Sequence, residues 1–175
     1  RLDDRWVDMV VMEKHLGKLP LKMGKGQELM TSAHNRGSSR PESKPLRTVV
    51  VKIGGSTLGG HDTTLQDLVT LQKRGIIPIV IHGGGKIITD WMQKQGVRPT
   101  FIKGLRVTDA QSLDIVVAVL TGLINKGLVA SLLALGGTAV GISGVDGTLL
   151  EGEVLEADLG LVGKVAKVNP GLVHQ

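Results

Sequence analysis

The fold is decided by two segments, Thr48-Val-Val-Val-Lys-Ile53 and Ile76-Ile-Pro-Ile-Val-Ile81, each of which runs directly into a cluster of glycines. Both segments are short, continuous and rich in β-branched residues, which is typical of strands buried inside a sheet. Gly54 and Gly55 end the first strand, and His82-Gly-Gly-Gly85 ends the second. Buried strands that alternate with helices predict an α/β fold with a parallel sheet.

Helical and strand patterns continue along the rest of the chain. We expect helices over residues 62–75, 86–95 and 108–135, and further strands over residues 99–103, 138–142, 148–155 and 162–168. The third helix opens with Thr108 and Gln111 at the spacing of a capping box. This order predicts a three-layer α/β/α sandwich around an open, mainly parallel sheet.

Composition excludes several classes of function. The chain has 175 residues, of which 41% are hydrophobic, 2% are aromatic and none is cysteine. So few aromatic side chains argue against a platform that stacks nucleic-acid bases. The lack of cysteine rules out disulfides, thiolate catalysis and cysteine zinc sites. No apolar run reaches a membrane span, and acidic residues near the start do not fit a secretory signal, so we expect a cytoplasmic protein without membrane or nucleic-acid partners.

The first part of the chain differs from the rest. Residues 1–48 carry a net charge of +4, against +1 for residues 49–175. We therefore divide the chain into a polar, linker-like extension over residues 1–47, with a helix over residues 5–16, and a folded unit over residues 48–175. A basic nucleic-acid or membrane surface would need a denser cluster of lysine and arginine.

The glycine clusters lie where open α/β sheets bind ligands, at the carboxyl ends of the strands. Glycine lets backbone N–H groups approach an anion, and a following helix N-terminus adds partial positive charge. Neither cluster matches the G-x-x-x-x-G-K-[ST] or the G-x-G-x-x-G phosphate motif. Tight turns without any ligand remain the alternative.

Three polar side chains near these clusters are candidates for chemistry. Lys52 interrupts an apolar strand, so its ammonium either reaches solvent or neutralises a carboxylate or phosphoryl group. Arg106 suits a carboxylate, or else pairs with Asp109 or Asp114. His82 is either an acid–base group or a histidine that holds the glycine turn by hydrogen bonds. No His, Asp and Glu spacing indicates a metal site.

Several motifs occur together in one order. They are Val51-Lys-Ile-Gly-Gly55, His82-Gly-Gly-Gly85, Gly104-Leu-Arg-Val-Thr-Asp109, Asn125-Lys126, Ala139-Val-Gly-Ile-Ser-Gly144 and Leu159-Gly-Leu-Val-Gly163. In this order they resemble the N-terminal half of the acetylglutamate kinases, a branch of the amino acid kinase family. The resemblance covers about residues 49–172.

The resemblance implies a fold, a reaction and roles for six residues. These enzymes transfer the ATP γ-phosphoryl group to the side-chain carboxylate of N-acetyl-L-glutamate in arginine biosynthesis, with Mg²⁺ carried on the nucleotide. By position, Lys52 would be the catalytic lysine, and Gly54 and Gly55 would contact the ATP phosphates. Gly84 and Gly85 would offer N–H groups to the acceptor, whose α-carboxylate Arg106 would hold.

The resemblance also sets limits and alternatives. The family's Asn-x-Asn-Ala-Asp segment, nucleotide-binding surface and second catalytic lysine have no match in this sequence. We therefore expect an acceptor-binding lobe without full catalysis, from a family whose full-length members form homo-oligomers. One alternative is a related kinase that acts on carrier-bound aminoadipate or glutamate, or on a small phosphate-bearing acceptor. Another is a non-catalytic binding or regulatory module.

Overall fold

The computed structural model describes residues 8–11, 47–54 and 63–173. The strands are β1 (Asp8–Val11), β2 (Arg47–Ile53), β3 (Ile76–His82), β4 (Phe101–Ile102), β5 (Leu105–Arg106), β6 (Val140–Ile142), β7 (Leu150–Val154) and β8 (Gly163–Val168). The helices are α1 (Thr64–Lys73), α2 (Gly85–Lys94), α3 (Ala110–Val117), the π-helical η1 (Ala118–Ile124) and α4 (Asn125–Ala134). Short 3-10 turns are η2 (Asp146–Thr148), η3 (Ala157–Leu159) and η4 (Pro170–Val173).

The main sheet has the strand order β2-β3-β1-β6. β2 and β3 are parallel, and β1 is antiparallel to both β3 and β6. β2, β3 and β6 therefore share one direction, as expected, and β1 runs against them. Two small antiparallel pairs, β4–β5 and β7–β8, complete the described strands, and β7 and β8 lie where strands were expected over residues 148–155 and 162–168.

β1 corrects the sequence prediction for the N-terminal segment. A helix was expected over residues 5–16, but residues 8–11 form a strand. The segment Asp8-Met-Val-Val11 pairs with β3 on one side and β6 on the other, so inter-strand hydrogen bonds replace helical ones. This tertiary pairing overrides a weak local pattern. β1 thus belongs to the same sheet as β2, which begins at Arg47, and residues 1–7 and 12–46 of the predicted extension lie outside the described residues.

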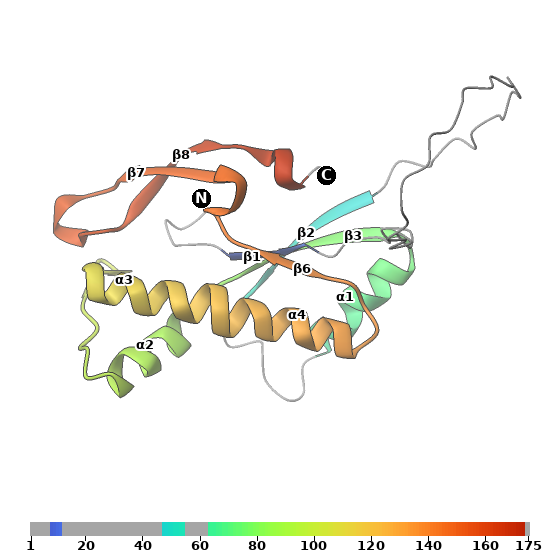
Figure 1. The fold of residues 1–175 in the computed structure, drawn as a ribbon, viewed down its shortest axis with the longest axis horizontal. Coiled ribbons are helices and arrows are strands. Elements are labelled where there is room, and N and C mark those ends of the chain that lie inside the picture. Colours follow the sequence, from blue (N-terminus) through green and yellow to red (C-terminus); the bar gives the residue numbers. More distant parts are fainter. Residues whose placement is uncertain (1–7, 12–46, 55–62, 174–175) are drawn as a thin grey trace, which may run out of the picture.

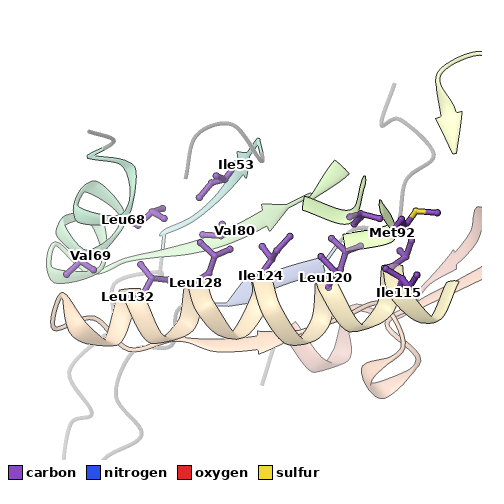
Figure 2. Packing of buried hydrophobic residues seen from close by; sticks show 13 residues of the cluster. Ile53, Leu68, Val69, Val80, Met92, Ile115, Leu120, Ile124, Leu128 and Leu132 are labelled. Atoms are coloured by element: carbon purple, nitrogen blue, oxygen red, sulfur yellow. The ribbon is translucent and has the colours of Figure 1, made fainter. Parts of the chain in front are cut away.

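The hydrophobic core lies between the sheet and a single layer of helices. Figure 1 shows α3 and α4 running along one side of the sheet, and the β7–β8 hairpin on the other side. Figure 2 shows Ile53 and Val80 of the sheet facing Leu120, Ile124 and Leu128 across this interface. The described residues thus supply the sheet and one helical layer of the expected sandwich.

β2 and β6 are more exposed than a buried-strand pattern predicts. In β2 only Ile53 is buried, and Val50 is 61% exposed. β6 is exposed or half-buried throughout. The physical reason is their place at the two edges of the described sheet, with described helices on only one face. In β3, by contrast, Pro78, Val80 and His82 alternate toward the core.

α3, η1 and α4 form one continuous helix, drawn from yellow to orange in Figure 1. It is long and apolar enough to cross a membrane by composition, but its buried face packs against the sheet. Its N-cap is Asp109, whose carboxylate accepts a hydrogen bond from the Ser112 backbone N–H at 2.8 Å. The predicted Thr108 capping box is therefore wrong. The carboxylate one residue later caps the helix instead, and this bond lowers the pKa of Asp109.

Candidate anion-binding site

The two glycine clusters follow strands that lie side by side. Ile53, the last residue of β2, stands opposite His82, the last residue of β3, in the parallel register. Gly54 and Gly83 therefore leave the same end of the sheet on adjacent strands. Gly55 lies outside the described residues. The sequence prediction that both clusters occur at one sheet edge is confirmed for the described glycines.

The turn from Gly83 to Gly85, here called the glycine turn, rests directly on the long helix. A Cβ atom on Gly84 would overlap the Cδ1 atom of Ile124 and come within 3.0 Å of Leu120 Cδ2. A Cβ atom on Gly83 or Gly85 would have no other atom within 4 Å. Glycine at position 84 thus lets the turn pack closely against the ends of these two side chains, whereas its two neighbours leave their backbone open.

The glycine turn leads straight into the N-terminus of α2. The first hydrogen bond of this helix runs from the Ile88 N–H to the Gly84 carbonyl, at 2.9 Å. No side chain caps this end, and the first turn contains no acidic residue. The first N–H groups of a helix lack intrahelical partners and carry partial positive charge. This end of α2 is therefore suited to an anion.

Arg106 adds a full positive charge beside the glycine turn. Its Nη2 atom donates to the Gly85 carbonyl at 3.1 Å and to the Thr89 hydroxyl at 2.9 Å. Its Nη1 atom lies 3.0 Å from Met92 Sδ, and the guanidinium stacks 4.8 Å from the centre of the Phe101 ring. Four contacts thus fix the orientation of this side chain.

Arg106 has no acidic partner among the described residues. Asp109 caps α3, and neither Asp109 nor Asp114 forms an ion pair with Arg106. The interpretation that Arg106 pairs with one of them is therefore wrong. Burial lowers the pKa of Arg106, although a guanidinium keeps its proton in proteins. A half-buried, oriented cation without a carboxylate is complementary to an anionic ligand.

His82 is buried beneath the start of the glycine turn, with 2% of its surface exposed. Its Nε2 atom lies 3.3 Å from the side-chain Nδ2 atom of Asn125, the first residue of α4. Burial lowers the pKa of His82, because charging an enclosed imidazole is unfavourable. Its place in the fold favours a structural contact with the turn over acid–base chemistry.

Lys52 is exposed in β2 and makes no ion pair with the described residues. It precedes the inward-facing Ile53, so the strand pleat directs it to the sheet face opposite the helices. The sequence left open whether this ammonium only reaches solvent or neutralises an anion, and in the structure the side chain is exposed at the surface. Lys52 lies two residues before Gly54, at the same carboxyl end of the parallel strands as the glycine turn.

Sequence reasoning missed the side chains that orient the site. Thr89 and Phe101 were given no role, although both contact Arg106. Asn125 appeared only as part of a motif. For Thr89, the signal was its place four residues after Gly85, which puts it over the first helical turn. For Phe101 no local pattern existed, because its partner is on the adjoining strand β5.

The fold is that of an α/β protein with two adjacent glycine-ended strands. The candidate anion site combines the N-terminus of α2 with an arginine that has no acidic partner among the described residues. A family model described as "Amino acid kinase family" matches residues 47–175. The chain therefore belongs to the amino acid kinase family. This confirms the resemblance and the class of fold inferred from the sequence.

Individual relatives are consistent with this assignment. The chain is 47% identical over 126 residues to an acetylglutamate kinase of Dehalococcoides mccartyi, covering 72% of this chain and 46% of that protein. It is 46% identical over 132 residues to an acetylglutamate kinase of Acaryochloris marina, covering 73% and 46%. Its fold is similar to the crystal structure of smu.665 from Streptococcus mutans UA159, with a TM-score of 0.62, 26% identity, and coverage of 73% and 53%. The chain spans about half the length of the curated relatives it matches.

Proposed function

We propose that this chain is the acceptor-binding part of an acetylglutamate kinase and binds N-acetyl-L-glutamate at the glycine turn. One observation carries the proposal. Arg106 is held beside Gly85 by Thr89 and Phe101, and no described carboxylate neutralises it. The α-carboxylate of N-acetyl-L-glutamate supplies the missing anion. Sequence identity of 44–47% to several acetylglutamate kinases supports the choice of this ligand.

The glycine turn and Arg106 would hold different parts of the acceptor. Arg106 binds the α-carboxylate, and the backbone N–H groups of Gly84 and Gly85 bind acceptor oxygens. Nothing lies within 4 Å of a Cβ built on Gly83 or Gly85, so the backbone on either side of Gly84 can approach a ligand closely. This division leaves the side-chain carboxylate of the acceptor free to react.

The proposed reaction needs charge neutralisation and no general base. One oxygen of the ionised side-chain carboxylate attacks the γ-phosphorus of ATP, and the bond to the bridging oxygen breaks as ADP leaves. A carboxylate is already deprotonated near neutral pH. Lys52 would neutralise the transferring phosphoryl group, and Gly54 and Gly55 would contact the phosphates. We assign these roles by position, because Lys52 and Gly54 leave the same sheet edge as the glycine turn.

Mg²⁺ would accompany ATP. The described residues contain no group of three or more His, Asp or Glu side chains able to hold a metal ion. The proposal therefore assigns the ion to the nucleotide phosphates, which is common for Mg²⁺ in phosphoryl transfer. We further infer a cytoplasmic setting and self-association in the full-length protein, with no nucleic-acid or membrane partner.

Calorimetric titration of N-acetyl-L-glutamate into the purified chain tests this proposal. We expect saturable binding that is lost in Arg106→Ala and kept in Arg98→Ala, which removes an exposed arginine near the end of α2. Titrations with L-glutamate and N-acetyl-L-aminoadipate test the related-kinase alternative. An ATP-turnover assay on the same samples separates acceptor binding from catalysis. A folded chain that binds none of these acceptors would contradict the proposal and favour a non-catalytic module.

A further inference from the structure

A buried polar cluster beneath the glycine turn is not used by the proposed reaction. The side-chain amide of Asn125 lies 3.3 Å from His82 Nε2 and 3.3 Å from the Ile142 carbonyl. Its Oδ1 atom accepts a hydrogen bond from Lys126 Nζ at 3.1 Å, and the same ammonium donates to the Gly141 carbonyl at 2.9 Å. One carboxamide from α4 thus joins the end of β3 to the end of β6, which are separated in the sheet by β1.

The partners of Asn125 determine which end of the amide faces His82. An ammonium only donates hydrogen bonds, so the atom beside Lys126 Nζ is the amide oxygen. A carbonyl only accepts, so the atom beside the Ile142 carbonyl is the amide nitrogen. That same nitrogen contacts His82, and therefore His82 Nε2 must accept.

An accepting Nε2 atom defines the state of the imidazole. His82 is neutral, and its proton is on Nδ1. This nitrogen is buried, and the backbone of Gly83 interacts with the ring, although burial outweighs that interaction and lowers the pKa of His82. The low pKa that burial gives to His82 is consistent with a neutral ring.

The π-helical segment η1 brings Asn125 into place. Helices of this type are rare, and short π segments are frequent at functional sites. Leu120 and Ile124 of η1 contact the position of Gly84, and Asn125, the next residue, faces His82. Ile124 and Asn125, at the junction of η1 and α4, are both buried, and they contact Gly84 and His82 respectively.

The opposing strand is also adapted to Asn125. A Cβ atom on Gly141 of β6 would overlap Asn125 Oδ1 and lie within 2.9 Å of its Cγ atom. Gly127, on α4, has nothing within 4 Å of the same construction. Of these two glycines, only the one on the strand that the carboxamide approaches is in close contact with it.

We propose that Asn125 is a positioning residue for the glycine turn, because its carboxamide holds His82 as a neutral imidazole with the proton on Nδ1. His82 ends β3 and directly precedes Gly83, so fixing its ring fixes the start of the turn. Asn125 acts through His82 and does not contact the ligand. The identity of that ligand, N-acetyl-L-glutamate, rests on the proposed function.

Nitrogen NMR of the full chain, labelled with ¹⁵N-histidine, tests the first half of this proposal. We assign the His82 ring by its loss in His82→Gln and measure the protonation of each nitrogen at pH 7.5. We expect a protonated Nδ1 and an unprotonated Nε2 in the wild-type protein. A wild-type ring that is protonated on Nε2 would overturn the proposal without any variant.

Two variants test the role of Asn125. In Asn125→Asp, the ionised carboxylate can only accept hydrogen bonds. The Nε2 atom of His82, which faces it, must then carry a proton. Gly141→Ala displaces the carboxamide without removing it, and we expect the Nε2 signal to shift there too. Gly127→Ala is the matched control on α4, and Leu132→Ala is a core variant on the same helix that lowers stability away from His82. An unchanged His82 spectrum in folded Asn125→Asp and Gly141→Ala would overturn the proposal.

Calorimetry with N-acetyl-L-glutamate tests the second half. We expect at least a tenfold weaker Kd in Asn125→Asp and Gly141→Ala, and less than a twofold change in both controls. Wild-type binding that persists in both variants, despite an altered His82 spectrum, would overturn the positioning role. Absence of binding to the wild-type chain would instead reject the proposed function, while the NMR result still decides the link between Asn125 and His82.

Discussion

The guanidinium of Arg106 donates to the hydroxyl of Thr89 over 2.9 Å, and that hydroxyl donates in turn to the Gly85 carbonyl over 3.0 Å. Arg106 also donates directly to the Gly85 carbonyl. Thr89 therefore links the charged group of the site to the backbone of the glycine turn. These three groups hold the Arg106 cation at the N-terminus of α2. An anionic ligand there is stabilised by the arginine charge and by the free N–H groups of the helix.

Thr89→Val should weaken binding of N-acetyl-L-glutamate about five- to tenfold, because a hydrogen bond to a charged group is lost. Valine keeps the shape of threonine but has no acceptor for Arg106. Thr70→Val is the matched control, since the Thr70 hydroxyl also donates to the carbonyl four residues earlier on its helix. Equal affinities for Thr89→Val and Thr70→Val by calorimetry would show that Thr89 does not orient the arginine.

Gly84→Ala should lower the free energy of unfolding by about 1–3 kcal/mol, because the added methyl group overpacks the contact with Ile124. Gly85→Ala should have little effect, since nothing lies within 4 Å of its Cβ position. Urea denaturation followed by circular dichroism measures both. If the two variants are equally stable, the glycine turn is not packed on η1 as described.

The neutral state of His82 predicts a pH dependence of stability. An unfolded histidine titrates near 6.5, whereas burial lowers the pKa of His82 in the folded protein. Below pH 6.5 the unfolded chain binds a proton that the folded chain does not. The free energy of unfolding therefore decreases as the pH is lowered. The contribution of His82 is at most about 1.4 kcal/mol per pH unit.

Denaturation curves of the wild type and His82→Gln between pH 7.5 and 5.5 measure this contribution. The comparison concerns the slope of stability against pH, since the substitution also changes stability at every pH. We expect a smaller loss on acidification in His82→Gln. Parallel slopes for the two proteins would mean that His82 becomes protonated in the folded state.

The outer edge of β2 should make the isolated chain self-associate. Among the described strands β2 pairs only with β3, and Val50 on this strand is 61% exposed. An unpaired edge with apolar side chains favours association. Val50→Lys should shift sedimentation toward the monomer, whereas Val145→Lys, at an exposed valine away from this edge, should not. A wild-type chain that sediments as a monodisperse monomer would contradict this expectation.

The sequence predicted the elements that rest on strong local signals. Both glycine-ended strands, the helices closed by Gly75 and Gly96, and the β7–β8 hairpin lie where their patterns placed them. Both helix-closing glycines have a positive φ, which explains why glycine ended these helices. The meeting of Arg106 with Gly85 was also expected, but only through a family resemblance, because 21 residues separate them.

Features that depend on distant partners were missed. β1 is a strand because β3 and β6 pair with it, and a sequence of four residues does not predict such distant partners. The π-helical segment has no local sequence signal. The contact between Asn125, which follows it, and His82 likewise joins residues far apart in the sequence. The exposure of Lys52 and Val50 follows from the edge position of β2, which a strand's own composition does not reveal.

In the proposed function, Arg106 binds the α-carboxylate of an N-acylated glutamate at the glycine turn. The most direct measurement is a two-by-two calorimetric cycle that pairs wild type and Arg106→Ala with N-acetyl-L-glutamate and its α-amide. We expect the amide to bind the wild type much more weakly than the acid, and Arg106→Ala to bind the two ligands with similar affinity. Equal discrimination between acid and amide by both proteins would contradict the assignment of Arg106 to that carboxylate.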